Sequence, residues 1–410
     1  MTVLHVTETL EGASGVATFV REIDAELKAR GVESRVCCCR DALSSVARSA
    51  NEDPDIIHVH GLWLGLYHRA AQWAYARGIP VVWSTHGMTA PWCMRHKRWK
   101  KRLAWWLYQR RDLRRASAIH CTSEQEVAWN AALGLKNCFV VPLGTREVSH
   151  AETPSAQRRE GVLLFVGRIY PVKGLKNLIK AWKIVKNHEA YVGTLPKNYC
   201  SPHYNPVDPV NPVEKNSANC HLPTRPWHLR IVGPDEAGHL AELKDEVRRL
   251  DLEDSVEFPG PKFGTDLSRE YDACDGLVLP SFTENFGATV IDALAHGKPV
   301  IASTATPWRE LRERGCGWWV DNSPESLASA IRALISGACP RPNRGLSPIS
   351  TGDRHSPIGD RPQIPTGDSP HFLGDTPRSE MASRARALVS EKYTWPAVAD
   401  TLIAHYSSIL

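Results

Sequence analysis

The chain has 410 residues, 42% of them hydrophobic and 23% charged, with a formal net charge of +5. This length exceeds one ordinary domain and predicts two, with enough apolar residues for packed cores. The mild positive charge does not indicate a nucleic-acid partner, and no apolar run is long enough to cross a bilayer. Because the 11 cysteines include no CxxC pair and the first residues lack a signal-peptide pattern, we expect reduced thiols and a cytoplasmic protein.

Strand and helix patterns alternate through the first part of the chain. Short apolar runs predict strands, and apolar residues at helical spacing predict helices. The expected strands lie at 2–8, 33–39, 55–61, 80–87, 116–123 and 138–144, and the expected helices at 15–31, at 67–78 and from Glu124 onward. This alternation predicts a parallel, doubly wound sheet, with its binding crevice at the carboxyl ends of the strands.

The same alternation restarts at Gly161. Here the expected strands lie at 161–168, 227–233, 255–260, 275–281 and 298–303, and the expected helices at 175–187, at 239–251 and from about Gly287. We therefore predict an α/β protein with one Rossmann-like domain at 1–150 and a second at 160–393. A polar linker at 150–160 joins them, and a last helix occupies 394–410.

Two stretches interrupt this pattern. Residues 190–226 are rich in Asn and Pro, and residues 340–378 contain loosely repeated units such as SPISTGD and SPIGD. Such compositions bury little apolar surface, so we expect disordered insertions. For the repeats, a role in binding a partner is the alternative.

The segment SFTENFGATVIDALAHGKPVIAS, residues 281–303, combines a helix start with two carboxylates. The free amides of a helix that begins near Gly287 form an anion site suited to phosphate. Glu284 and Asp292 flank that site and can accept hydrogen bonds from hydroxyls. A ligand with hydroxyls on both sides of a diphosphate is a nucleotide-sugar, so Glu284 would hold its sugar and Asp292 its ribose. The alternative is that Glu284 caps the helix and Asp292 is a surface residue.

This segment resembles the E-x7-E signature of the retaining GT-B glycosyltransferases of family GT4. VGRIYPVKG, RIVGPDE, THG, EGASGV and YTWPAVADTLIAHY resemble other parts of that family, and CTSEQE and GCGWWV are similar to its bacterial lipopolysaccharide and exopolysaccharide transferases. The resemblance implies two Rossmann-like domains that face a cleft. It places the acceptor on the first domain and the nucleotide-sugar on the second, with the last helix crossing back toward the first. It also implies a hexosyltransferase reaction that retains configuration.

One position departs from the family, because Asp292 stands where the family has Glu. The Asp side chain is shorter by about 1.5 Å, the length of one C–C bond. We expect this to weaken donor binding by on the order of 1 kcal/mol without abolishing activity.

The resemblance assigns two sets of site residues. Arg168 and Lys173 match the family's Arg and Lys pair and would neutralise charge on the departing diphosphate. The alternative is that both are ordinary charged side chains exposed to solvent. The expected catalytic residues are His86, Arg168, Lys173 and Glu284. The expected donor-binding residues are Gly15, Gly233, Phe258, Gly260, Asn285, Phe286, Gly287 and Asp292.

Three histidines stand at expected strand ends. His86 ends the strand at 80–87, and the resemblance favours its contact with the reacting sugar. His58 and His60 are two residues apart in the strand at 55–61 and therefore lie on one face. For His58 and His60 we favour a structural hydrogen-bonding role.

We expect no metal or other cofactor. The letters DPD at 53–55 fit the D-x-D motif with which transferases of another fold hold a divalent ion. They stand at the start of an expected strand, away from the crevice, and include Pro, so we interpret them as a turn. Arg168 and Lys173 would supply the positive charge instead.

Residues 95–115, RHKRWKKRLAWWLYQRRDLRR, are strongly basic and interleaved with Trp and Leu. Helical spacing brings Trp99, Leu103, Trp106 and Leu107 near one face. Two interpretations stay open: this face contacts an anionic membrane surface, or it packs on its own domain.

The sequence thus predicts a metal-independent glycosyltransferase of cell-surface polysaccharide synthesis. It would move a sugar from a nucleotide-sugar to a hydroxyl of a glycan or lipid-linked acceptor, with no nucleic-acid partner. The expected location is the cytoplasm or the inner face of the cytoplasmic membrane. Two alternatives stay open: a non-catalytic nucleotide-sugar-binding protein and a GT-B sugar-nucleotide epimerase.

Overall fold

The computed structural model describes most of the chain. The described residues are 1–11, 15–38, 53–95, 98–146, 148, 160–193, 225–338 and 378–410. The expected linker and most of both expected insertions lie outside these residues. The chain forms two compact units. The first comprises Met1–Val148, Glu284–Ile291 and Leu388–Leu410, and the second comprises Ser149–Thr283 and Asp292–Ala387.

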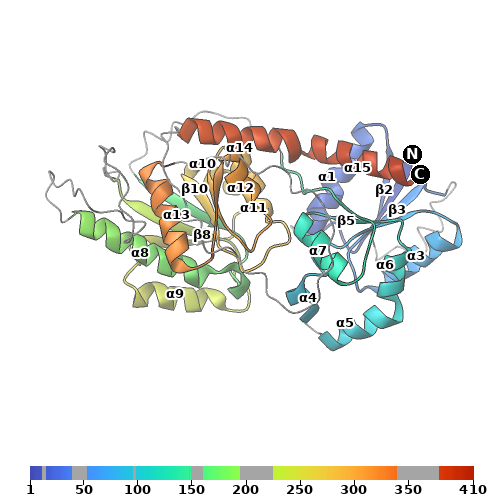
Figure 1. Ribbon diagram of the computed structural model, residues 1–410, viewed down its shortest axis with the longest axis horizontal. Helices are drawn as coiled ribbons and strands as arrows, with labels where there is room; N and C mark the ends of the chain where they lie inside the picture. The colour runs from blue at the N-terminus through green and yellow to red at the C-terminus, as the bar shows by residue number, and fades with distance from the viewer. Residues whose placement is uncertain are drawn as a thin grey trace, which may run out of the picture. The chain divides into compact units, whose positions relative to one another are not determined.

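The first unit contains a six-stranded parallel sheet with the order β2-β1-β3-β4-β5-β6 (Figure 1). Its strands are β1 Thr2–Thr7, β2 Glu33–Cys38, β3 Ile56–His60, β4 Val81–Ser84, β5 Ala118–Cys121 and β6 Cys138–Val140. Its helices are α1 Gly15–Ala29, α3 Gly65–Ala76, α4 Pro91–Arg95, α5 Arg98–Ala104, the π-helical turn η1 Trp105–Gln109, α6 Arg110–Arg115, α7 Glu124–Ala132 and α15 Trp395–Ile409. The central strands β3, β4 and β5 are buried throughout, as parallel strands covered on both faces require.

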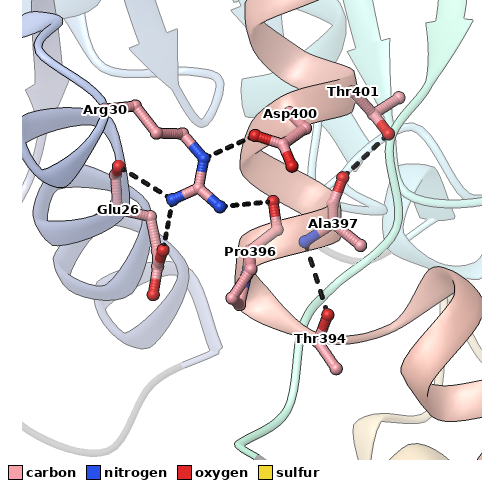
Figure 2. Close-up of polar contacts among 7 residues, drawn as sticks. All are labelled: Glu26, Arg30, Thr394, Pro396, Ala397, Asp400 and Thr401. Carbon is pink, nitrogen blue, oxygen red and sulfur yellow. Dashed lines mark hydrogen bonds and ion pairs between the residues drawn. The ribbon is translucent and has the colours of Figure 1, made fainter.

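Helix α15 contributes to the core of the first unit, although it is far from the rest of that unit in sequence. Val398, Leu402 and Tyr406 are fully buried in a cluster with residues of β1 and α1. Figure 2 shows the polar side of this contact, where Arg30, which follows α1, donates to Asp400 Oδ1 at 2.5 Å and to the Pro396 carbonyl at 3.1 Å. Thr394 caps the helix, because its Oγ1 accepts from the backbone N–H of residue 397.

The second unit contains a six-stranded parallel sheet with the order β12-β11-β10-β7-β8-β9. Its strands are β7 Gly161–Val166, β8 Trp227–Val232, β9 Val256–Gly260, β10 Gly276–Leu279, β11 Val300–Ser303 and β12 Gly317–Val320. The remaining helices are the 3-10 turn η3 Pro171–Lys173, α8 Leu175–Gly193, α9 His239–Arg249, α10 Gly264–Ala273, α11 Ala288–Ala295, α12 Glu310–Arg314, α13 Pro324–Ser336 and α14 Arg378–Lys392. Helix α8 packs against both α9 and α13 (Figure 1).

Two sheets of six parallel strands with connecting helices confirm the predicted α/β fold class. Each expected strand is present. One boundary was wrong: α8 ends at Gly193, so the helix runs into the stretch that was expected to be an insertion from residue 190. Strand β12, the turn η3 and the helices α4, α10, α12, α13 and α14 were not predicted.

Candidate functional site

Glycines at three neighbouring strand ends of the second unit leave the backbone bare. Gly167 and Gly233 follow β7 and β8, and Gly260 ends β9. Gly233 has a φ of +153°, and a Cβ placed there would lie 1.8 Å from the Gly167 carbonyl oxygen. The Gly233 N–H donates to the Gly260 carbonyl at 3.1 Å. Only glycine fits at Gly233, because the Gly167 carbonyl occupies the place that a side chain would take, whereas a Cβ on Gly260 would meet no atom within 4 Å. The backbones after β7 and β8 are therefore packed against each other, and the open space lies beside Gly260.

Arg168 directly follows Gly167 in the chain. Its Nη1 is 2.8 Å from Glu236 Oε2, and both side chains are exposed. The loops after β7 and β8 are also joined by backbone, because Ile169 N–H donates to the Pro234 carbonyl at 2.8 Å and Glu236 N–H to the Ile169 carbonyl at 3.1 Å. The expected cation therefore stands at the carboxyl ends of the strands, on a loop that its neighbour holds in place.

Lys173 ends η3, in a loop that is held against the segment leading to Glu284. Gly174 has a φ of +71°, and a Cβ there would lie 2.0 Å from the Pro280 carbonyl oxygen. The Phe282 N–H donates to the Val172 carbonyl at 2.8 Å. This backbone contact fixes the loop of Lys173 beside residues 280–282, which follow β10.

Asn322, which the sequence analysis did not single out, joins three loops of the second unit. Its Nδ2 donates to the Pro280 carbonyl at 2.5 Å, and its own carbonyl accepts from Asn177 Nδ2 at 2.7 Å. Asn322 follows β12, and Asn177 lies in the first turn of α8. The signal in the sequence was a short polar DNS turn after the apolar run GWWV.

The segment with the two carboxylates has the local structure that was expected. Gly287, with a φ of +84°, precedes α11, so the helix starts beside Gly287 as expected. Glu284 is half-buried before the helix, and Asp292 is half-buried within it. The Phe286 side chain is buried, and Asn285 Nδ2 donates to Thr122 Oγ1 at 2.8 Å within the first unit.

Phe258 and Gly15 are the two remaining donor-binding candidates. Phe258 lies in β9, and its side chain is half-buried. Gly15 is the first residue of α1, and a Cβ there would meet no atom within 4 Å. The middle of its loop, residues 12–14, lies outside the described part of the chain.

His86 occupies a turn of unusual backbone geometry after β4. Its φ of +45° is rare for a residue with a side chain, and Gly87 follows with a φ of +73°. The buried carboxylate of Glu126 holds this turn: it accepts from Thr85 Oγ1 at 2.6 Å and from the Gly87 N–H. A strained residue that its surroundings fix in this way is typical of functional sites.

Glu126 also holds the next strand end and was missed by the sequence analysis. Its Oε2 accepts from the Thr122 N–H at 2.8 Å and from Thr122 Oγ1 at 3.1 Å. Ser123 caps α7 by accepting from the Glu126 N–H at 3.2 Å. The pattern Ser-x-x-Glu at 123–126 was a readable signal of a helix start, but the contact with the turn of His86 depends on the strand order.

Buried histidines surround the carboxyl end of the first sheet. His5, His58, His60 and His120 are fully or almost fully buried, and His86 is partly buried. Burial lowers the pKa of His5 to about 4 and that of His86 to about 3, and it also lowers the pKa of His58, His60 and His120. All five imidazoles are therefore neutral near pH 7.

The DPD letters at 53–55 lie before β3, as the sequence predicted. Asp55 Oδ2 accepts from the Thr2 N–H at 2.7 Å, and Asp53 Oδ1 lies 3.8 Å from Arg77 Nε. Asp55 thus fixes the start of β1, and Asp53 lies near the end of α3. A different group among the described residues has the spacing of a metal site. One ring nitrogen from each of His5, His58 and His60 lies within 4.8 Å of the others.

The basic segment 95–115 presents large apolar side chains to solvent. Trp99 and Trp106 are each 69% exposed, Leu107 is 65% exposed and Leu103 is 55% exposed. The segment is anchored behind this face, because the buried Asp112 of α6 lies 2.6 Å from His68 Nδ1 and accepts from Gln72 Nε2 at 2.9 Å, both on α3. The interpretation that these four side chains pack on their own domain is therefore wrong. None of the described helices has the length and apolar character to span a bilayer.

Both units match known family models. Residues 40–144 match a model described as a glycosyl transferase 4-like domain, and residues 216–337 match one described as glycosyl transferases group 1. The chain thus carries a glycosyltransferase-type domain in each unit.

Curated relatives match only over part of their length. A D-inositol 3-phosphate glycosyltransferase of Kineococcus radiotolerans is 29% identical over 50% of this chain and 45% of its own. The lipopolysaccharide core biosynthesis mannosyltransferase LpsB of Rhizobium meliloti is 37% identical over 22% of this chain and 26% of its own. The chain therefore spans about half or less of these relatives.

A solved structure matches the whole chain. The Anabaena protein HepE, crystallised in complex with UDP and glucose, has a TM-score of 0.64 at 18% identity and covers 100% of both chains. At this identity the match concerns the fold, and it confirms the GT-B class.

Proposed function

From the glycosyltransferase domains in both units, we propose that this protein transfers a sugar from a nucleotide-sugar to a hydroxyl of a glycan acceptor. The observation that carries the proposal is the group of glycines at the ends of β7, β8 and β9, with open space beside Gly260 and with Arg168 and Lys173 in the connection that follows β7. Bare backbone admits a nucleoside diphosphate closely, and fixed cations stabilise its charge. Since HepE was crystallised with UDP and glucose, a UDP-sugar is the first donor to test.

Each proposed donor residue has a defined task. Arg168 and Lys173 neutralise the charge that grows on the diphosphate as the sugar leaves. Glu284 accepts hydrogen bonds from sugar hydroxyls, and Asp292 accepts one from the ribose. The amides at the start of α11 face the diphosphate. These groups need no divalent cation, so the proposed reaction is independent of metal.

We propose that the reaction retains configuration, as in family GT4. The acceptor oxygen bonds to the anomeric carbon on the face from which the diphosphate departs. The bond from that carbon to the diphosphate breaks, and the acceptor proton passes to a diphosphate oxygen. His86 of the first unit contacts the reacting sugar. The product's anomeric configuration, measured by NMR, tests this step.

Replacing Lys173 tests the assignment of the cation. Lys173→Ala should lower kcat by about 100-fold or more with a much smaller change in donor binding, because the charge is needed most in the transition state. Lys176→Ala is the matched control, since Lys176 lies in the first turn of α8 and pairs with Glu242 on an exposed surface. Equal kcat values for Lys173→Ala and the parent would exclude the assigned role.

Donor screening separates the proposal from its alternatives. Thermal shifts with UDP-, GDP- and ADP-sugars identify the donor, and nucleotide release in the presence of membrane extract shows transfer. Binding without acceptor-dependent release would favour a non-catalytic binder. Conversion of the nucleotide-sugar into its epimer without acceptor would favour an epimerase.

We further propose that the acceptor is lipid-linked, in lipopolysaccharide or exopolysaccharide synthesis, and that residues 95–115 bind the anionic surface of the cytoplasmic membrane's inner face. The support is that basic side chains lie close to the exposed Trp side chains of this segment. Arg110 Cζ lies 5.2 Å from the centre of the Trp106 ring, and Lys100 Nζ lies 5.3 Å from the centre of the Trp99 ring. Interfacial Trp and basic residues together favour anionic headgroups.

Vesicle flotation tests the membrane contact. The parent should float with vesicles of anionic lipid at low salt and less with neutral vesicles. Trp99→Ser with Trp106→Ser should lose this binding. Phe263→Ser is the control, since Phe263 is 63% exposed and lies outside the basic segment. Equal flotation of the double variant and the control would refute the proposed surface.

A further inference from the structure

Two chains of hydrogen bonds cross the buried histidines of the first unit. In the first chain, Tyr406 Oη lies 2.5 Å from His58 Nδ1, His58 Nε2 lies 2.6 Å from Ser84 Oγ, and Ser84 Oγ lies 2.6 Å from His120 Nδ1. This series of hydrogen bonds ends at the Val141 carbonyl oxygen, which lies 2.8 Å from His120 Nε2. A carbonyl only accepts, so His120 must carry its proton on Nε2. Each preceding link then donates toward this end, and every group in the chain is satisfied.

The second chain leads to His86. His5 Nδ1 lies 2.9 Å from His60 Nε2, and His60 Nδ1 lies 3.3 Å from His86 Nε2. For neutral rings this chain has two directions. If His86 donates, the last proton falls on His5 Nε2, which is buried and has no acceptor among the described residues.

The opposite direction is less costly. If His5 donates to His60 and His60 donates to His86, the unpaired group at His5 Nε2 is a lone pair rather than an N–H. Buried N–H groups without an acceptor are rarer in proteins than acceptors without a donor. The arrangement therefore favours His86 as the acceptor at Nε2, with its own proton on Nδ1.

The remaining nitrogen of His86 is the one that a ligand can meet. His86 is partly exposed, and its Nδ1 has no hydrogen-bond partner in the described ranges. We propose that His60, backed by His5, is a positioning residue that fixes the proton of His86 on Nδ1, so that His86 donates a hydrogen bond to its ligand and does not act as a base. The identity of that ligand as a sugar rests on the proposed function, whereas the proton position does not.

A bound metal is the competing explanation for His5, His58 and His60. Of their six ring nitrogens, five already have a partner at 2.5 to 3.3 Å, and His5 Nε2 is the exception. A metal would have to displace several of these hydrogen bonds. The hydrogen-bonded arrangement explains the contacts without such a cost.

Nitrogen NMR on the parent protein tests the proposal directly. In protein labelled with ¹⁵N-histidine, His86 should show a protonated Nδ1 and an unprotonated Nε2 at pH 7, with the signal assigned by its loss in His86→Asn. A protonated Nε2 would overturn the proposal. One equivalent of zinc, nickel or copper in the purified protein, found by elemental analysis, would overturn it as well.

Variants separate positioning from a structural role. His60→Phe removes the donor, so the His86 proton should redistribute between both nitrogens and kcat should fall by about 100-fold with little change in donor KM. His60→Asn keeps an amide donor near the position of Nδ1 and should restore both the tautomer and most of the activity. Ser84→Ala interrupts the other chain and should change neither. An unchanged His86 tautomer in His60→Phe would refute the positioning role, even if the parent showed no transferase activity.

Discussion

The strand ends of the two units present opposite kinds of chemistry. In the first unit they carry side chains, with imidazoles at His58, His60 and His86 and the buried carboxylate of Glu126 behind them. In the second unit the corresponding ends of β7, β8 and β9 carry glycine. Two sheets of similar construction therefore end in neutral polar side chains in one unit and in glycine backbone in the other. This teaches that the parallel sheet fixes where a ligand binds, whereas the residues after each strand decide which ligand it is.

The largest effect should come from adding a side chain at Gly233. Gly233→Ala places a Cβ where the Gly167 carbonyl stands, at a φ of +153°, so unfolding should become easier by about 4 kcal/mol and donor binding should be lost. Denaturant titration and calorimetry with the donor measure both quantities. Gly238→Ala is the control: its φ is +74° but its surroundings are open, so the cost should be about 1 kcal/mol. Similar losses in both variants would mean that strain alone matters at Gly233.

The next effect should come from the first unit. Glu126→Gln replaces one carboxylate oxygen by an NH2 group, which must then face the N–H of either Gly87 or Thr122, so the free energy of unfolding should fall by about 3 kcal/mol. Transferase activity should fall with it, because the turn of His86 is released. Glu124→Gln, an exposed acid on the same helix, should leave both unchanged.

The neutral histidines predict a dependence of stability on pH. The pKa of buried His5 is about 4 in the native protein, below its ordinary value of 6.5. Between these values the unfolded chain binds the proton and the native protein does not. The free energy of unfolding should therefore fall by about 1.4 kcal/mol per pH unit for His5 as the pH drops from 6.5 toward 4.

Denaturation midpoints between pH 4 and pH 7 measure this slope. His5→Phe should reduce it, since it removes the titrating group while keeping the ring buried. A slope that is the same in the variant would show that His5 is protonated in the native protein or accessible to water.

The smallest effect concerns the departure at Asp292. Asp292→Glu extends the carboxylate by about 1.5 Å toward the proposed ribose, so donor binding should tighten by about 1 kcal/mol, or roughly fivefold. Calorimetric titration of both proteins with the same nucleotide-sugar measures this. Weaker binding in the variant would place the ribose contact elsewhere.

The sequence predicted the parts of the fold that depend on neighbours in the chain. Apolar runs such as 161–166 and 227–232 predicted strands because both faces of a parallel strand are buried. Strand β12 was missed because its GWWV run is short. Helix α13 was missed although Ser323 caps it and Pro324 begins it, which are readable signals.

The site residues that were missed depend on strand order. Glu126 contacts Thr85, 41 residues earlier, only because β4 and β5 are adjacent. His5 meets His60 across 55 residues because β1 pairs with β3. Periodicity and composition contain no information on which strands become neighbours, so these contacts could not be derived from them. His86 and Lys173 were predicted because family motifs mark them, and their roles stay predictions.

The position of α15 also sets the order in which the protein can fold as it is made. The core of the first unit, which begins with β1, includes Trp395, Val398 and Leu402, and His58 reaches Tyr406 across 348 residues. On the ribosome the core of this unit cannot be completed until residues 395–409 have been synthesised, whereas the sheet of the second unit, complete by residue 320, can form earlier. The unit that starts first is thus completed last, and a chaperone that shields apolar surface would act on its nascent form.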